Sequence, residues 1–198
     1  MKKMLVFLSL VSLATWAYPA DFKIMAGLSN SKSTERIGPE GVGWIYTPYS
    51  EFGAGFAAGG GLEFFLTKNL AIEADALFIQ KGSRIRVEDM GMLIGHYMAR
   101  INELSIPVLA KVFLKPGTSP YILAGGEFAF VLTDGPRSVD YGLIGGIGFR
   151  KQLNNVGLSI EARYHHGLQD MRSDINASDF PAGLRKMRGF IFMLGFSI

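Results

Sequence analysis

The sequence contains no cysteine, so no disulfide can stabilise the fold and no lipid can be attached through a cysteine. Basic residues exceed acidic ones only by 20 to 17, and no run of lysine or arginine occurs, which argues against nucleic-acid binding. After the first twenty residues, no hydrophobic run is long enough for a membrane-spanning helix. Yet 48% of the residues are hydrophobic and 25 are glycine. Apolar content without apolar runs is typical of a transmembrane β-barrel, whose strands present apolar side chains only at alternate positions.

The amino terminus has the pattern of a secretion signal. Two lysines precede an apolar segment at residues 4–14, and the sequence TWA at residues 15–17 provides a cleavage site of the small-x-small type. The apolar segment is too short to cross a membrane as a helix. We therefore predict a cleaved signal peptide over residues 1–17, with a cut after residue 20 as the alternative, and a single β-barrel domain over residues 18–198.

The carboxyl-terminal segment alternates strictly between large apolar residues and a smaller, mixed set. The large residues occupy every second position up to the end of the chain: Phe190, Phe192, Leu194, Phe196 and Ile198. A strand with one wholly apolar face that ends on the last residue is typical of the final strand of an outer-membrane barrel.

Seven further segments have the alternation of a β-strand. We predict strands over residues 21–29, 52–66, 70–81, 99–115, 120–132, 140–153 and 156–167, before the last at 186–198. The connections alternate between long and short, and the long ones are residues 30–50, 83–98 and 169–185. Outer-membrane barrels show this alternation because their periplasmic turns are short and their outer loops are longer. The sequence thus predicts an all-β fold, an eight-stranded antiparallel up-and-down transmembrane β-barrel with both termini periplasmic.

The second face of these strands combines glycine with charged residues. Eleven residues are predicted to form a lumen charge network: Lys23, Glu63, Glu73, Asp75, Lys81, Glu103, Lys111, Glu127, Arg150, Glu161 and Arg163. Six acids against five bases suggest pairing, because unpaired charges away from water cost several kcal/mol. A soluble β-sandwich or lipocalin-like barrel is the alternative, with the apolar face inside and the charged face solvated. The abundant glycine favours the membrane barrel, because large side chains would collide in a narrow lumen.

Three sequence segments carry a family resemblance: Gln80-Lys81-Gly82, Leu104-Ser105-Ile106-Pro107, and Pro120-Tyr121 leading to Gly125-Gly126. Their order, from Phe52 to Leu132, resembles the PorT-type outer-membrane β-barrel family, a small porin-like barrel domain. The resemblance implies the architecture and a place in the cell envelope of a Gram-negative bacterium. One named branch of such families is linked to protein secretion.

We expect no catalytic, cofactor-binding or metal-binding site. His165 and His166 are neighbours on a predicted strand and point to opposite faces, so they cannot chelate one metal ion together without a bulge. His165, Ser173 and Glu161 are close in sequence and contain the residue types of a hydrolase triad. No nucleophile motif surrounds them, however, and a triad is recognised by its geometry.

The lumen of an eight-stranded barrel is just wide enough for side chains to fill. We therefore expect a non-enzymatic monomer in the bacterial outer membrane, with extracellular loops for binding or adhesion, or for membrane scaffolding. Narrow-pore transport or a role in a secretion machine is one alternative, and an outer-membrane lipid-modifying enzyme is another. The expected partners are outer-membrane lipid, lipopolysaccharide, the barrel-assembly machinery during biogenesis and an unknown extracellular ligand, with no nucleic acid.

Overall fold

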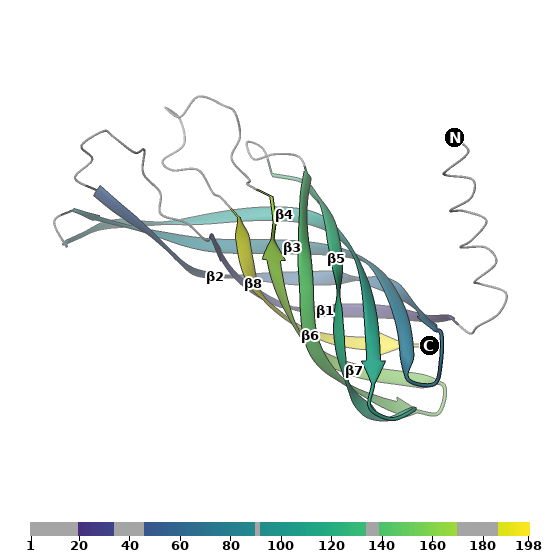
Figure 1. The fold of residues 1–198 in the computed structure, drawn as a ribbon. Coiled ribbons are helices and arrows are strands. Elements are labelled where there is room, and N and C mark those ends of the chain that lie inside the picture. Colours follow the sequence, from purple (N-terminus) through teal and green to yellow (C-terminus); the bar gives the residue numbers. More distant parts are fainter. Residues whose placement is uncertain (1–19, 34–45, 90–91, 134–138, 170–185) are drawn as a thin grey trace, which may run out of the picture.

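Eight antiparallel strands close into a barrel in the computed structural model of the chain (Figure 1). The structure describes residues 20–33, 46–89, 92–133, 139–169 and 186–198, and the predicted signal peptide lies outside them. The strands are β1 (Ala20–Ser33), β2 (Tyr46–Phe65), β3 (Leu70–Asp89), β4 (Met92–Phe113), β5 (Ser119–Val131), β6 (Val139–Leu153), β7 (Val156–Gly167) and β8 (Met187–Ser197). Each strand pairs with its sequence neighbours, and β8 returns to β1. The predicted eight-stranded antiparallel barrel is therefore confirmed.

The two ends of the barrel differ in their connections. Three short connections, residues 66–69, 114–118 and 154–155, lie at the end where β1 begins and β8 finishes, which we call the turn end. At the β6–β7 turn, Asn154 has a φ of 54°, the left-handed conformation that a two-residue hairpin requires. The opposite end, which we call the loop end, holds the longer connections β1–β2, β5–β6 and β7–β8, together with the two-residue connection β3–β4. No helix long and apolar enough to cross a membrane occurs among the described residues.

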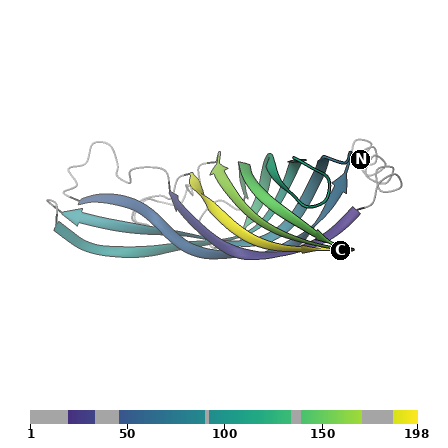
Figure 2. The ribbon, with the colours of Figure 1, turned by 90° about the horizontal axis from the view of Figure 1, so that it is seen from below.

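The prediction of a long loop over residues 83–98 is wrong. Strand β3 continues to Asp89 and β4 begins at Met92, with Asp89 paired to Met92, and β2 extends alongside from Tyr46. Figure 2 shows these three strands reaching beyond the others at the loop end. Their sequences lack a regular apolar face here. Strand pairing continues nevertheless, because it needs backbone hydrogen-bond partners and not an apolar face. Part of the predicted loop 30–50 is likewise strand, and its residues 34–45 lie outside the described residues.

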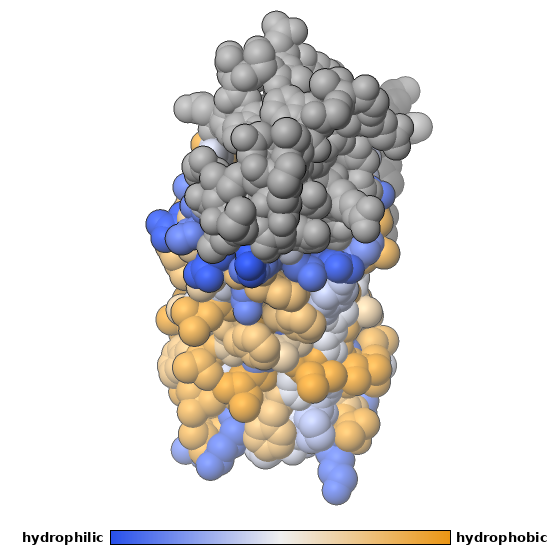
Figure 3. Space-filling model, turned by 90° about the vertical axis from the view of Figure 1, so that its left-hand side faces the viewer, coloured by the Kyte–Doolittle hydropathy of each residue, from blue (hydrophilic) through white to orange (hydrophobic). Residues whose placement is uncertain are grey.

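The wall of the barrel is apolar outside. Predicted lipid-facing residues of β4 and β7 are exposed, among them Val108 at 52% and Ile160 at 55%. Figure 3 shows a broad apolar band, with hydrophilic side chains at its lower end and next to the part drawn in grey. Charged residues are instead buried inside the barrel. This arrangement is the reverse of a soluble sandwich or a lipocalin-like barrel and excludes both alternatives.

Candidate functional site: the charged lumen

The eleven residues predicted for the lumen are each 6% exposed or less. They lie on the inner face of the closed wall, since their neighbours along each strand are the more exposed ones. The structure brings them together in two clusters. The turn-side cluster contains Lys23, Glu63, Glu73, Asp75, Lys111, Arg150, Glu161 and Arg163. The loop-side cluster contains Lys81, Glu103 and Glu127.

Two carboxylates and three cations form the centre of the turn-side cluster. Glu73 accepts hydrogen bonds from Lys23 at 3.2 Å, from Arg163 at 2.7 Å and from Lys111. Glu161 accepts from Lys111 at 3.0 Å, from Arg163 Nε at 2.7 Å and from Lys23. These five residues come from four strands, β1, β3, β4 and β7, so the ion pairs cross the lumen and link opposite walls.

Arg163 pairs with three carboxylates in this cluster, as Lys111 also does. Its guanidinium group contacts Asp75 at 2.8 Å, Glu73 at 2.7 Å and Glu161 at 2.6 Å. A planar guanidinium with five donors suits such a three-way contact, whereas an ammonium group would supply only a point charge. Breaking a buried network of this kind by removing one member leaves uncompensated charge in a low-dielectric interior.

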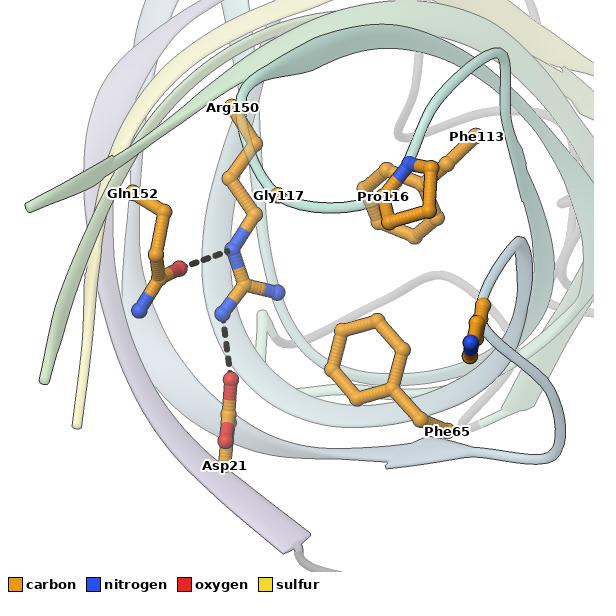
Figure 4. A pocket seen from close by; sticks show the side chains of 8 residues that line it. Asp21, Phe65, Phe113, Pro116, Gly117, Arg150 and Gln152 are labelled. Carbon is orange, nitrogen blue, oxygen red and sulfur yellow. Dashed lines mark hydrogen bonds and ion pairs between the residues drawn. The ribbon is translucent and has the colours of Figure 1, made fainter. Parts of the chain in front are cut away.

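Arg150 extends the network to the turn end. It pairs with Glu63 and with Asp21, and its Nε donates to Gln152 at 3.2 Å. Figure 4 shows Arg150, Asp21 and Gln152 on one side of a cavity of about 280 Å³, with Phe65, Phe113 and Pro116 around the other. The Arg150 guanidinium carbon lies 5.2 Å from the centre of the Phe65 ring. Charged and aromatic groups together therefore narrow this mouth of the lumen.

The loop-side cluster has more acids than bases. Lys81 Nζ lies 2.7 Å from Glu103, 3.7 Å from Glu127 and 3.6 Å from Asp140. His165 Nδ1 lies 2.6 Å from Glu127, and its Nε2 lies 3.2 Å from Lys81 Nζ. One lysine thus faces three carboxylates and an imidazole.

Apolar side chains fill the lumen between the two clusters. On β3, Leu77 and Ile79 lie between Asp75 and Lys81, and both are 1% exposed. They belong to a buried group whose members also come from β1, β2 and β8: Met25, Ala57, Leu77, Ile79, Ile191 and Met193. Apolar packing therefore separates the loop-side cluster from the turn-side cluster.

Sequence reasoning missed three members of the site. Asp140 is 1% exposed in the loop-side cluster, Tyr121 donates to Glu161 at 2.6 Å, and Asp21 pairs with Arg150. The alternation of β6 could have found Asp140, which shares the face of Arg150. With Asp140, the buried charges of the described residues are seven acids and five bases, rather than the predicted six and five.

Gly148, on the inner face of β6, lies where the lumen has no space for a larger side chain. A Cβ at Gly148 would lie 2.4 Å from the ring of Tyr121, the residue that donates to Glu161. Any larger residue at this position would displace the tyrosine from the network.

The residues considered for hydrolase chemistry do not meet in the described part of the chain. His165 contacts Glu127 on β5, whereas Glu161 contacts cations of the turn-side cluster. Ser173 lies outside the described residues. Within the described ranges, no group of three or more acidic, histidine or cysteine residues is arranged to hold a metal ion.

A closed barrel wall that is apolar outside and charged inside is the arrangement of a transmembrane β-barrel. The profile of a known family, described as an outer membrane protein beta-barrel domain, matches residues 20–138. The chain belongs to this family and is an outer-membrane protein. The match does not separate the PorT-type branch from the rest of the family, so that finer assignment stays a prediction.

Solved outer-membrane barrels resemble the structure at low sequence identity. The crystal structure of OprG from Pseudomonas aeruginosa has a TM-score of 0.53 and 14% identity, and the match covers 91% of this chain and 95% of that chain. AlkL in DMPC lipid bilayers has a TM-score of 0.48 and 16% identity, with 91% and 90% covered. The E. coli outer membrane protein W has a TM-score of 0.39 and 13% identity, with 92% and 100% covered. The likeness to OprG supports the fold alone. No curated protein sequence matches this one.

Proposed function

We propose that this protein is a non-enzymatic outer-membrane barrel with a closed lumen, and that it acts through its loop end as a binding or scaffolding protein. The observation that carries this proposal is the turn-side cluster, in which Glu73 and Glu161 each bridge Lys23, Lys111 and Arg163 across the lumen. Such paired charges stabilise a closed interior, whereas a wide aqueous pore would leave them separated by water. A closed lumen leaves the outer surfaces as the place for interaction.

The orientation is part of the proposal: the turn end faces the periplasm and the loop end faces outward. The short turns at one end support it, because outer-membrane barrels place such turns on the periplasmic side. The three strands β2, β3 and β4, which extend past the membrane band, would then project from the cell.

The first test concerns location. We expect the protein in the outer-membrane fraction, with different migration of heated and unheated samples on gels, because a folded barrel resists detergent until it is heated. Protease added to intact cells should cut within the loop-end connections and leave the turns 66–69 and 114–118 uncut. Recovery of the protein in the detergent-free periplasmic fraction would contradict this expectation.

The second test concerns the lumen. In planar lipid bilayers, the purified protein is expected to show negligible steady conductance, because ion pairs and apolar side chains fill the barrel from Arg150 to Lys81. Heat-denatured protein serves as the control for leaks caused by the preparation. Large and stable openings of the unmodified protein would refute the closed lumen.

Narrow-pore transport is the second candidate, and a specific observation favours it. Asp140 is buried, and neither of its carboxylate oxygens accepts a hydrogen bond from the described residues. Asp140, Glu103 and Glu127 place three carboxylates around the single ammonium group of Lys81. A passage through this part of the lumen would therefore prefer cations. Cation-selective openings that lose selectivity in Asp140→Asn would support transport over the closed lumen.

A further inference from the structure

Three basic residues form a row on the outer face of β1, β8 and β7 at the loop end. Lys32 pairs in register with Arg188, and Arg188 pairs with His166. Residues opposite each other on antiparallel strands share one face, so the three side chains stand side by side on the wall. No carboxylate of the described residues lies within ion-pair distance of Lys32 or Arg188. We call this set the basic row.

Aromatic rings lie directly beneath the basic row. Phe190 and Tyr164, two residues further toward the turn end on β8 and β7, have ring centres 5.2 Å apart. The ring centre of Phe52 lies 6.5 Å from that of Phe190 and 4.8 Å from the ammonium nitrogen of Lys32. Aromatic rings at this level are typical of the boundary between lipid headgroups and acyl chains. The basic row therefore lies at headgroup depth.

A shallow apolar groove continues below the rings on the same strands. It has a volume of about 540 Å³ and lies on the outer wall over β1, β6, β7 and β8. Ala26 and Ala162 end at Cβ, whereas Leu28, Phe192 and Leu194 beside them are large and more than half exposed. The small residues thus leave a hollow between larger side chains.

We propose that the basic row and this groove together bind one phosphorylated acyl glycolipid of the outer leaflet, of the lipid A type. The phosphate contacts Lys32, Arg188 and His166, and one acyl chain lies in the groove against Ala26 and Ala162. Charge complementarity selects the occupant. Two cations without a carboxylate partner among the described residues, together with an imidazole at headgroup depth, match a phosphate with several acceptor oxygens. The inference rests on the orientation in the proposed function, which places the loop end in the outer leaflet.

The dimensions agree with such a ligand. Arg188 and Leu194 are six residues apart on β8, which corresponds to roughly 20 Å along the strand. The strands of a barrel are tilted by about 35–45°, so the depth along the membrane normal is about 15 Å. This is close to half of a hydrocarbon core of about 30 Å. A lipid with its phosphate on the basic row would therefore reach the groove with its acyl chain.

The phosphate contact is tested with the full-length mature protein in detergent micelles, with purified bisphosphorylated lipid A as the probe. Native mass spectrometry is expected to show one retained lipid A per barrel. The double variant Lys32→Gln with Arg188→Gln should weaken retention about tenfold, because it removes two charged donors to the phosphate. The matched control is Lys115→Gln with Lys151→Gln, which removes two exposed bases at the turn end. Equal retention by the double variant and the control would overturn the site.

The groove is tested separately by filling it. Ala162→Phe should reduce lipid A retention several-fold, whereas Ala124→Phe, an equally outward position on β5, should not. Heat-dependent gel migration shows that each variant is folded before binding is measured. Unchanged retention by Ala162→Phe would overturn the acyl part of the proposal.

The source of the phosphate is decided by two further probes. Dephosphorylated lipid A and phosphatidylglycerol should each be retained more weakly than bisphosphorylated lipid A. Equal retention of phosphatidylglycerol would replace the glycolipid by a phospholipid and overturn the assignment. Because these measurements use the outer wall in micelles, they do not depend on lumen conductance. Loss of the lipid-site proposal would therefore be seen as unchanged lipid A retention in the variants. Loss of the closed-lumen proposal would be seen separately, as conductance in planar bilayers.

Discussion

Replacing Arg163 with alanine is expected to lower the free energy of unfolding of the barrel by about 3–5 kcal/mol, since it breaks a buried ion-pair network. The change removes the partner of Asp75, Glu73 and Glu161 together and leaves three carboxylates beside only Lys23 and Lys111. Urea titration of the refolded protein in detergent, followed by tryptophan fluorescence or gel migration, measures the effect. The same variant is expected to show a small leak in planar bilayers, because a link between opposite walls is lost.

Two controls make this prediction specific to the network. Arg163→Lys keeps the charge but cannot contact three carboxylates with a planar fork, so its stability should lie between that of the alanine variant and the unmodified protein. Lys151→Ala removes an exposed base of β6 and should change stability by less than about 0.5 kcal/mol. An Arg163→Ala barrel that unfolds at the same urea concentration as the unmodified protein would show that the network does not stabilise the fold.

Replacing Val108 with arginine is expected to destabilise the membrane-inserted barrel by about 2–4 kcal/mol, the cost of a basic residue at the bilayer midplane. Val108 lies at the middle of the β4 segment that pairs with β5, from Glu103 to Phe113, and its side chain points outward. The measurement is reversible unfolding from lipid vesicles, since detergent would not reproduce the depth dependence.

Depth and size serve as controls for Val108→Arg. Val112→Arg lies on the same face near the turn end and should cost only about 0–1 kcal/mol, because an arginine there can reach the interface. Val108→Leu enlarges the side chain without charge and should be close to neutral. If both arginine variants had the stability of the unmodified protein, the outer face of β4 would not contact lipid.

Much of the fold follows from alternation in the sequence. On β4, Leu104, Ile106 and Val108 alternate with Glu103, Ser105 and Lys111, and the structure exposes the first set and buries the second. The period of two fixes the face of every residue once one face is known. The error at residues 83–98 has a physical cause: β-pairing beyond the membrane needs hydrogen-bond partners but no apolar face. The sequence pattern therefore found the part of the hairpin that lies in the membrane and missed the rest.

Most residues of the candidate site were predictable from the sequence, but the contacts between them were not. The sequence alone placed eleven charged residues on one face, because the charges fall on the positions between the apolar ones. Only the tertiary structure decided that they divide into two clusters, since this depends on the stagger between strands far apart in the chain. Lys23 and Glu161 are 138 residues apart, yet they meet because closure of the barrel brings β1 beside β8 and near β7. The basic row also depends on this closure, since Lys32 and Arg188 become neighbours only where the first strand pairs with the last.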